Sequence, residues 1–129
     1  MINGIHHIAL KACGVENFDE LVRFYTEILD LKIVRSWGEG EGIGMMLDTG
    51  SGILEIFASA KDAPGEGALR HLAFAVDSVD DCIEAVRAAG SKITIEPKDI
   101  VIASNPPYPA KIGFCIGPVG ETVEFFEVK

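Results

Sequence analysis

The sequence predicts an α+β protein built from two tandem βαβββ modules. The first observation is an internal repeat, in which His7-Ile-Ala-Leu-Lys near the start is matched by His71-Leu-Ala-Phe-Ala in the second half. Each of these strand-like segments is followed by apolar residues at helical spacing, and each half then closes with short strands separated by glycine-bearing turns. We therefore expect a single domain over residues 1–129, with module 1 at about 4–59 and module 2 at about 69–128.

The first module opens with a strand at 6–11, where apolar and polar side chains alternate. A helix should follow, with Asn17 as its N-cap and an apolar stripe that ends near Asp30. Three further strands are expected in this module, at 31–36, 44–47 and 52–57.

The second module repeats this order. Ser78 should cap its helix and Gly90 should end it, because serine accepts hydrogen bonds from the first turn and glycine readily adopts the left-handed conformation after the last. Its later strands are expected at 92–95, 111–116 and 121–128, with 105–109 as a surface loop and 58–69 as the linker between modules.

Composition and charge exclude several classes of protein. The chain has 129 residues, of which 48% are hydrophobic and 24% charged, as is typical of a globular domain. Its formal net charge of −9 disfavours nucleic acid and anionic membranes as partners and favours the binding of cations. We expect a cytoplasmic protein, because there is no bilayer-spanning apolar stretch, no secretion signal and no CxxC pattern among three cysteines.

Four polar residues occur where strand alternation would place apolar or small side chains: His7, Glu55, His71 and Glu124. Bulky neighbours such as Leu54 and Ile56 should pack under the helix, so these four side chains should lie on the opposite face of each module's sheet. The neighbouring His6 should point the other way. Trp37, Met45 and Met46 are expected in core or dimer contacts, with a substrate pocket as the alternative.

The repeated His and Glu favour a metal site over structural roles. Any one of these residues alone is more simply a structural histidine or a solvent-exposed glutamate. A carboxylate among apolar strand residues is costly unless it is paired or bound to a cation. Two nitrogen and two oxygen donors suit zinc, nickel, cobalt or manganese in an open, catalytic site.

The sequence resembles the vicinal oxygen chelate superfamily, which includes glyoxalase I, methylmalonyl-CoA epimerase, fosfomycin-resistance proteins, bleomycin-binding proteins and extradiol dioxygenases. The resemblance covers nearly the whole chain. It rests on His6-His-Ile-Ala-Leu, Phe24-Tyr-Thr-Glu-Ile-Leu-Asp-Leu, Arg70-His-Leu-Ala-Phe and Gly117-Pro-Val-Gly-Glu-Thr-Val-Glu-Phe. Two departures from the familiar pattern, Gly117 and Val119, replace aspartates in the closing motif, and Leu29-Asp30 replaces Leu-Gly after the helix.

The resemblance implies paired βαβββ modules that form an open, U-shaped mixed sheet (glyoxalase/bleomycin-resistance/dioxygenase-like) around a metal ion. Its ligand positions fall on His7, Glu55, His71 and Glu124, which would bind one divalent metal ion (Zn, Ni, Co or Mn) per site. In small members of the superfamily, both copies of a homodimer commonly contribute ligands. Glutamate at the second ligand position is similar to glyoxalase I, whereas the epimerases usually carry glutamine there.

The resemblance further implies a metal-dependent lyase or isomerase similar to glyoxalase I, the lactoylglutathione lyase. Such an enzyme abstracts a proton beside a chelated carbonyl through a metal-stabilised enediolate. Glu124 would be the base, with Glu55 able to take its place. Lys11 and Ser59 fall on the positions that bind the glutathione carboxylate in bacterial glyoxalases.

The substrate would be a small molecule, either a 2-oxoaldehyde–thiol adduct or an acyl-CoA. Two alternatives to a glyoxalase I-like enzyme stay open on the same fold. One is an enzyme similar to methylmalonyl-CoA epimerase, and the other is a non-catalytic small-molecule binding or resistance protein.

Overall fold

The computed structural model describes residue 1, residues 3–62 and residues 69–129, and it divides into two compact units, Met1–Pro64 and Gly65–Lys129. Each unit contains one long helix and a four-stranded mixed sheet in the order βαβββ, so the predicted α+β class with two modules is confirmed. The middle of the predicted linker, 63–68, lies outside the described residues. Within the described ranges, no helix is long and apolar enough to cross a membrane.

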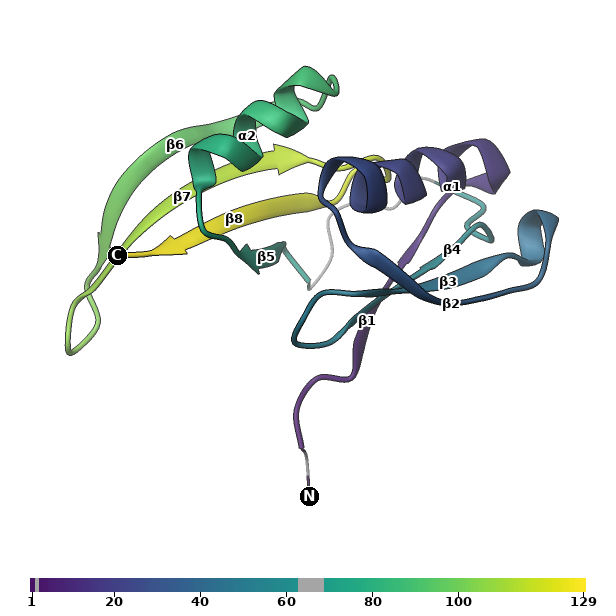
Figure 1. Cartoon of the computed structure of the whole chain (residues 1–129), viewed down its shortest axis with the longest axis horizontal. Coiled ribbons are helices and arrows are strands. Elements are labelled where there is room, and N and C mark those ends of the chain that lie inside the picture. The colour runs from purple at the N-terminus through teal and green to yellow at the C-terminus, as the bar shows by residue number, and fades with distance from the viewer. Residues whose placement is uncertain (2, 63–68) are drawn as a thin grey trace. The chain divides into compact units, whose positions relative to one another are not determined.

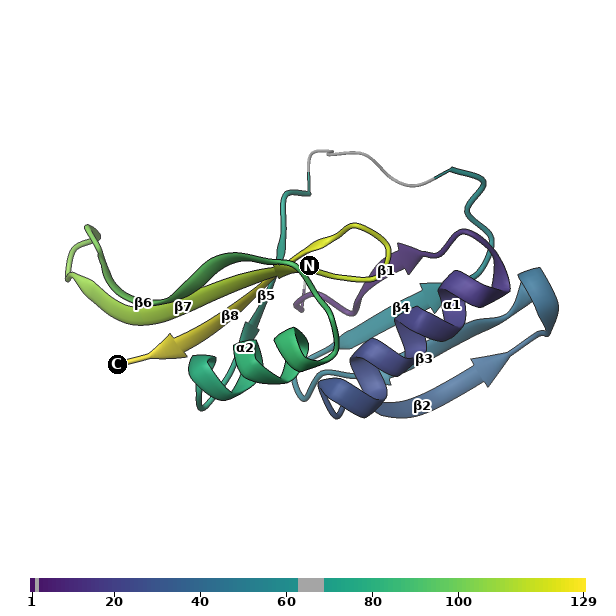
Figure 2. The ribbon, with the colours of Figure 1, turned by 90° about the horizontal axis from the view of Figure 1, so that it is seen from above.

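Unit 1 forms a sheet with the strand order β1-β4-β3-β2, in which β1 and β4 are parallel. One face is covered by α1 (Figures 1 and 2), whose Phe18 and Leu21 are fully buried together with Ile56 of β4. In chain order its elements are β1 (His7–Lys11), α1 (Gly14–Arg23), a π-helical turn (Phe24–Ile28), β2 (Lys32–Trp37), a 3-10 turn (Gly40–Gly42), β3 (Gly44–Asp48) and β4 (Ile53–Phe57).

Unit 2 repeats this topology with the strand order β5-β8-β7-β6, and β5 and β8 are parallel. Its helix α2 covers one face of the sheet (Figure 1), with Val79, Ile83 and Val86 fully buried. The elements are β5 (Leu72–Ala75), α2 (Val79–Ala88), β6 (Ile93–Ile102), β7 (Tyr108–Ile116) and β8 (Thr122–Val128).

The predicted ends of α2 are confirmed, whereas the predicted start of α1 is wrong. The Ser78 hydroxyl accepts a hydrogen bond from the backbone N–H of Asp81 at 3.2 Å, and Gly90 has a φ of +92°. In unit 1 the helix begins at Gly14, three residues before Asn17. The Asn17 side chain lies inside the first turn and accepts a hydrogen bond from the backbone N–H of Cys13, the residue before the helix.

Two predicted strand bounds in unit 2 are also wrong. Strand β6 continues to Ile102 rather than ending at Ile95, and β7 begins at Tyr108 rather than at Lys111, so the loop lies at 103–107 rather than at the predicted 105–109. The register of β6 against β7 shifts between Ile95 and Lys98, around Pro97. An edge strand with such a bulge tolerates a proline that would otherwise remove a ladder hydrogen bond.

Candidate functional site

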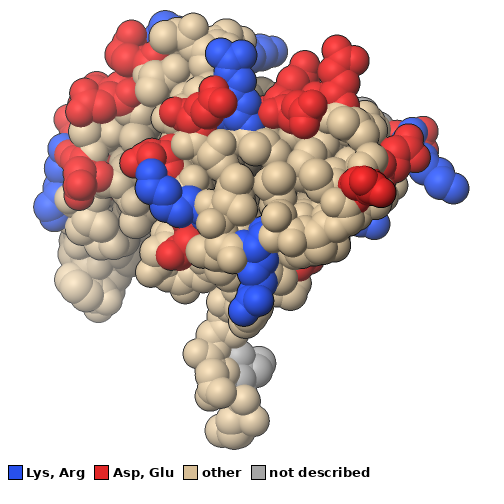
Figure 3. Space-filling model, turned by 45° about the vertical axis from the view of Figure 1, so that its right-hand side comes forward, with Lys and Arg blue, Asp and Glu red and all other residues tan. Residues whose placement is uncertain are grey.

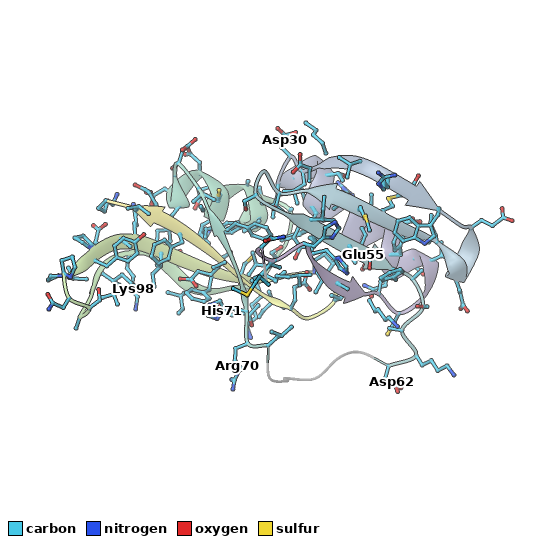
Figure 4. All side chains as sticks on the ribbon, turned by 90° about the horizontal axis from the view of Figure 1, so that it is seen from below. Asp30, Glu55, Asp62, Arg70, His71 and Lys98 are labelled. Carbon is cyan, nitrogen blue, oxygen red and sulfur yellow. The ribbon has the colours of Figure 1, made fainter. Side chains whose placement is uncertain are left out.

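His7 and Glu55 lie on the face of the unit 1 sheet that α1 leaves uncovered. Figure 4 shows this unit from below, with Glu55 labelled on β4. Leu54 and Ile56 on either side of Glu55 are buried, so strand alternation turns the Glu55 side chain to the opposite face. The Nε2 atom of His7 lies 3.8 Å from the Oε1 atom of Glu55.

The ring of His7 is in contact with His6 through its other nitrogen. The two Nδ1 atoms are 2.9 Å apart, and the rings meet edge to face with their centroids separated by 5.2 Å. The prediction that His6 points away is wrong, because β1 begins at His7 and strand alternation does not reach the preceding residue. A partner at Nδ1 orients the imidazole so that Nε2 faces Glu55, as outer partners do for metal-binding histidines.

His71 and Glu124 form the corresponding pair in unit 2. The Nε2 atom of His71 lies 3.1 Å from the Oε2 atom of Glu124, whose side chain is only 10% exposed. The ring of Phe114 meets the His71 ring edge to face. Burial raises the pKa of Glu124, and the nearby His71 opposes part of that rise. A carboxylate so removed from water is stabilised when a cation binds to it.

The two pairs occupy equivalent places in the two sheets. In unit 1, Glu55 is the cross-strand partner of Ala9, which lies two residues after His7. In unit 2, Glu124 is the partner of Ala73, again two residues after the histidine. Since both strand pairs are parallel, the same register brings an imidazole and a carboxylate together twice.

Each pair offers one nitrogen and one oxygen donor, which are ligand types that divalent transition-metal ions accept. Over the described residues, no group of three or more His, Cys, Asp or Glu that could hold a metal ion is present. The structure thus brings His7 to Glu55 and His71 to Glu124, and the set of four ligands stays a prediction.

The two predicted substrate-binding residues lie at one end of the unit 1 sheet. Lys11 is the last residue of β1 and is exposed. Ser59 follows β4, is also exposed, and forms an isolated bridge with Cys13. Lys11 shares the face of His7 by strand alternation, but its role and that of Ser59 stay predictions.

Two residues of β2, Arg35 and Trp37, also lie on this face; Arg35 was not predicted there, and Trp37 only as the alternative to a core or dimer contact. The register of β2 shifts between Ile33 and Arg35, after which Arg35 pairs with Met46 and Trp37 pairs with Gly44. Met46 is in turn the partner of Glu55. Trp37 is 39% exposed, so a core position for it is wrong, whereas a dimer contact and a place in a substrate pocket both stay predictions. Strict alternation from Ile33 would put both side chains under α1, and nothing in the sequence marks the shift.

Comparison with known proteins identifies a family. The model of the Glyoxalase/Bleomycin resistance protein/Dioxygenase superfamily matches residues 4–105. No curated protein matches the sequence. Among solved structures, a glyoxalase family protein from Enterococcus faecalis is 27% identical, with a TM-score of 0.70 over 97% of this chain and 98% of that one.

Two more distant structures share the fold. FosX from Listeria monocytogenes, a fosfomycin resistance protein solved with Mn(II) and sulfate, is 18% identical, with a TM-score of 0.74 over 100% of this chain and 95% of that one. Glyoxalase I from Leishmania major, described as trypanothione-dependent, is 20% identical, with a TM-score of 0.72 over 98% and 87%.

Proposed function

The chain belongs to the glyoxalase/bleomycin resistance protein/dioxygenase superfamily, and we propose that it is a metal-dependent lyase or isomerase similar to glyoxalase I. The observation that carries this proposal is the repeated pair, His7 with Glu55 and His71 with Glu124, at the same register in both sheets. A structural role for one pair would not require the same two residue types at the equivalent place in the other unit.

We assign His7, Glu55, His71 and Glu124 as the ligands of one divalent metal ion, zinc, nickel, cobalt or manganese. The donor chemistry supports this assignment, because neutral imidazole and ionised carboxylate are the usual ligands of these ions. When bound, such an ion acts as a Lewis acid that polarises a substrate carbonyl. The contact of His6 with His7 would hold one ligand in place.

Glu124 is the proposed base. Burial raises the pKa of its carboxyl, and a carboxylate with a raised pKa is a stronger acceptor for a proton from carbon. The Glu124 oxygen would take the proton beside the carbonyl and return it to the neighbouring atom of the same substrate. Glu55, at the equivalent position in unit 1, is the alternative base.

The substrate that the proposal favours is a 2-oxoaldehyde–thiol adduct, with Lys11 as a point charge for a substrate carboxylate and Ser59 as a hydrogen-bond partner. Lysine supports this role less specifically than arginine would, because it lacks the planar fork that binds both carboxylate oxygens. The proposed assembly is a homodimer.

Metal analysis and a turnover assay test the proposal together. We expect purified protein to contain a divalent metal and to consume methylglyoxal only when a thiol is present. His71→Ala and Glu124→Gln should each weaken metal binding and turnover by about 100-fold or more, since each removes a ligand. Glu84→Gln is the matched control, because Glu84 is exposed on α2 and pairs with Arg87.

Unchanged metal affinity in both ligand variants would contradict the assignment. Turnover that survives in Glu55→Gln would instead favour the epimerase-like alternative, in which glutamine occupies that position. Stoichiometric metal without turnover of any thiol adduct or acyl-CoA would favour the non-catalytic alternative.

A further inference from the structure

We propose that the face of unit 1 opposite α1 recognises the planar, anionic part of a small-molecule substrate, with Trp37 as the stacking surface and Arg35 as the cation. The inference rests on the proposed function only in taking the face that bears Glu55 as the substrate side. It concerns the part of the substrate beyond the reacting carbonyl, which it specifies as an aromatic or similarly flat group that carries a carboxylate.

Trp37 lies directly over the backbone of β3. A Cβ atom at Gly44 would come within 2.6 Å of Cε2 and Cζ2 of Trp37, and within 2.7 Å of its Nε1. The indole therefore fills the space that any larger residue at Gly44 would need. The ring of Phe57 meets it from the side, with the centroids 5.9 Å apart and the ring planes at 67°. Although its ring contacts Gly44 and Phe57, Trp37 remains 39% exposed.

Two cations flank this aromatic pair. Arg35 is two strands away from Glu55 in the same row, through Met46. With neighbouring strands about 4.8 Å apart, the backbones of Arg35 and Glu55 are separated by about 10 Å. Lys11 ends the next row, which runs through Phe57 and Gly44 to Trp37. Arg35 thus precedes Trp37 by two residues on β2, and Lys11 is the cross-strand neighbour of Phe57, whose ring meets the indole.

The charges of Arg35 and Lys11 are not compensated locally. Neither side chain forms an ion pair or a hydrogen bond with another residue in the described ranges, although the chain has a net charge of −9 and acidic side chains are widespread on the surface (Figure 3). In the same ranges Arg23, Lys32, Arg87, Lys111 and Lys129 pair with carboxylates, whereas Lys61, Lys92 and Lys98 form no ion pair either.

These features match one ligand chemistry. A flat ring stacks on an exposed indole, and a carboxylate accepts two parallel hydrogen bonds from an arginine guanidinium. The register shift in β2 is what turns both Arg35 and Trp37 to this face, and bulges beside binding sites commonly redirect side chains in this way.

The fluorescence of Trp37 tests the proposal directly, because it is the single tryptophan of the chain. Metal-free protein in a chelating buffer is titrated with benzoate, with benzyl alcohol and with acetate. We expect benzoate to change the emission saturably, at a half-saturation concentration at least about tenfold below that of either partial analogue. Arg35→Ala should raise the value for benzoate about tenfold and leave that for benzyl alcohol unchanged. Arg23→Ala, which removes an arginine from α1, is the matched control and should change neither.

Gly44→Ala tests the stacking surface. The φ of Gly44 lies outside the left-handed region, so alanine suits the backbone and must displace the indole instead. We expect a shifted emission maximum and about tenfold weaker benzoate binding, with circular dichroism to show that the sheet is intact. Calorimetry on Trp37→Ala should show the same loss without relying on fluorescence.

Equal half-saturation for all three ligands, or no effect of Arg35→Ala, would overturn the proposal. Saturation that requires added metal would overturn it as well, and would leave the proposed metal site standing. If only the proposed metal site fails, the purified protein contains no divalent metal, yet benzoate still binds in the presence of chelator.

Discussion

Replacing Gly113 by alanine should destabilise unit 2, because α2 lies directly on this residue. A Cβ atom at Gly113 would be 2.8 Å from Cγ1 and 3.0 Å from Cδ1 of Ile83, and 3.0 Å from Cγ1 of Val79. Carbon atoms in contact normally stay about 3.5–4.0 Å apart. Ile83 and Val79 are both fully buried, so α2 or β7 must move by roughly half an ångström or more to relieve the overlap.

The expected cost follows from two opposing effects. Overpacking of a close-packed core costs about 1–3 kcal/mol. Alanine in place of glycine raises the free energy of unfolding by about 0.4–1 kcal/mol, because it restricts the unfolded chain. The net loss of unfolding free energy should be about 1–2 kcal/mol, which for a chain of this length lowers Tm by roughly 3–8 °C.

Urea unfolding followed by circular dichroism measures this loss. Gly42→Ala is the matched control, since a Cβ there meets nothing within 4 Å and its φ lies outside the left-handed region, so we expect a change within about 0.5 kcal/mol. Ile83→Val removes one of the clashing atoms, so Gly113→Ala should cost less in that background. If Gly113→Ala is as stable as wild type, or lowers the free energy of unfolding equally with Ile83 and with Val at position 83, then α2 does not contact β7 at this residue.

Two further predictions concern acid stability and thiol reactivity. The pKa of Glu127 is lowered, first by the hydrogen bond from Lys129 and then by that from the backbone N–H of Val79 at the start of α2. Its contribution to stability is present above the ordinary value of 4.5 and is lost as pH falls through the lowered pKa, so Glu127→Gln should be less stable than wild type at neutral pH and equal to it in strong acid. A gap that persists in urea unfolding under strongly acidic conditions would contradict this. Burial, aided by Glu121, raises the pKa of Cys115 to about 12, so a thiol reagent at neutral pH should label the exposed Cys13 first and Cys115 only after unfolding. Peptide mapping that found Cys115 labelled as fast as Cys13 would disprove it.

Features that depend on neighbouring residues were predictable from the sequence. The ends of α2 follow from Ser78 and Gly90, whose side-chain oxygen and missing Cβ act locally. Alternation in β4 and β8 was enough to place Glu55 and Glu124 opposite the helices. The pairing of each glutamate with a histidine was predictable because the repeat itself carries the information.

Features that depend on pairing between distant strands were not predictable. The predicted start of α1 is wrong because asparagine is typical of N-caps, whereas Asn17 lies inside the helix and accepts a hydrogen bond from the backbone N–H of Cys13. The prediction ends β6 at Ile95 because the residues that follow are charged and include a proline. Only the pairing of β6 with β7 shows that a bulge accommodates this segment. The faces of Arg35 and Trp37 were likewise set by a register shift, which inverts the alternation on which the prediction depended.

Two register shifts at equivalent places give the two glutamates different neighbours on the edge strands. Strand β2 shifts between Ile33 and Arg35, and β6 shifts at the equivalent place, between Ile93 and Ile95. Arg35 therefore lies in the row of Glu55, and Ile95 lies in the row of Glu124, through Phe114. An apolar row deprives Glu124 of water, and burial is the main cause of its raised pKa. The same shift thus ends the row of Glu124 with an apolar residue, in keeping with its proposed role as the base, and ends the row of Glu55 with a cation, in keeping with the proposed recognition of an anion.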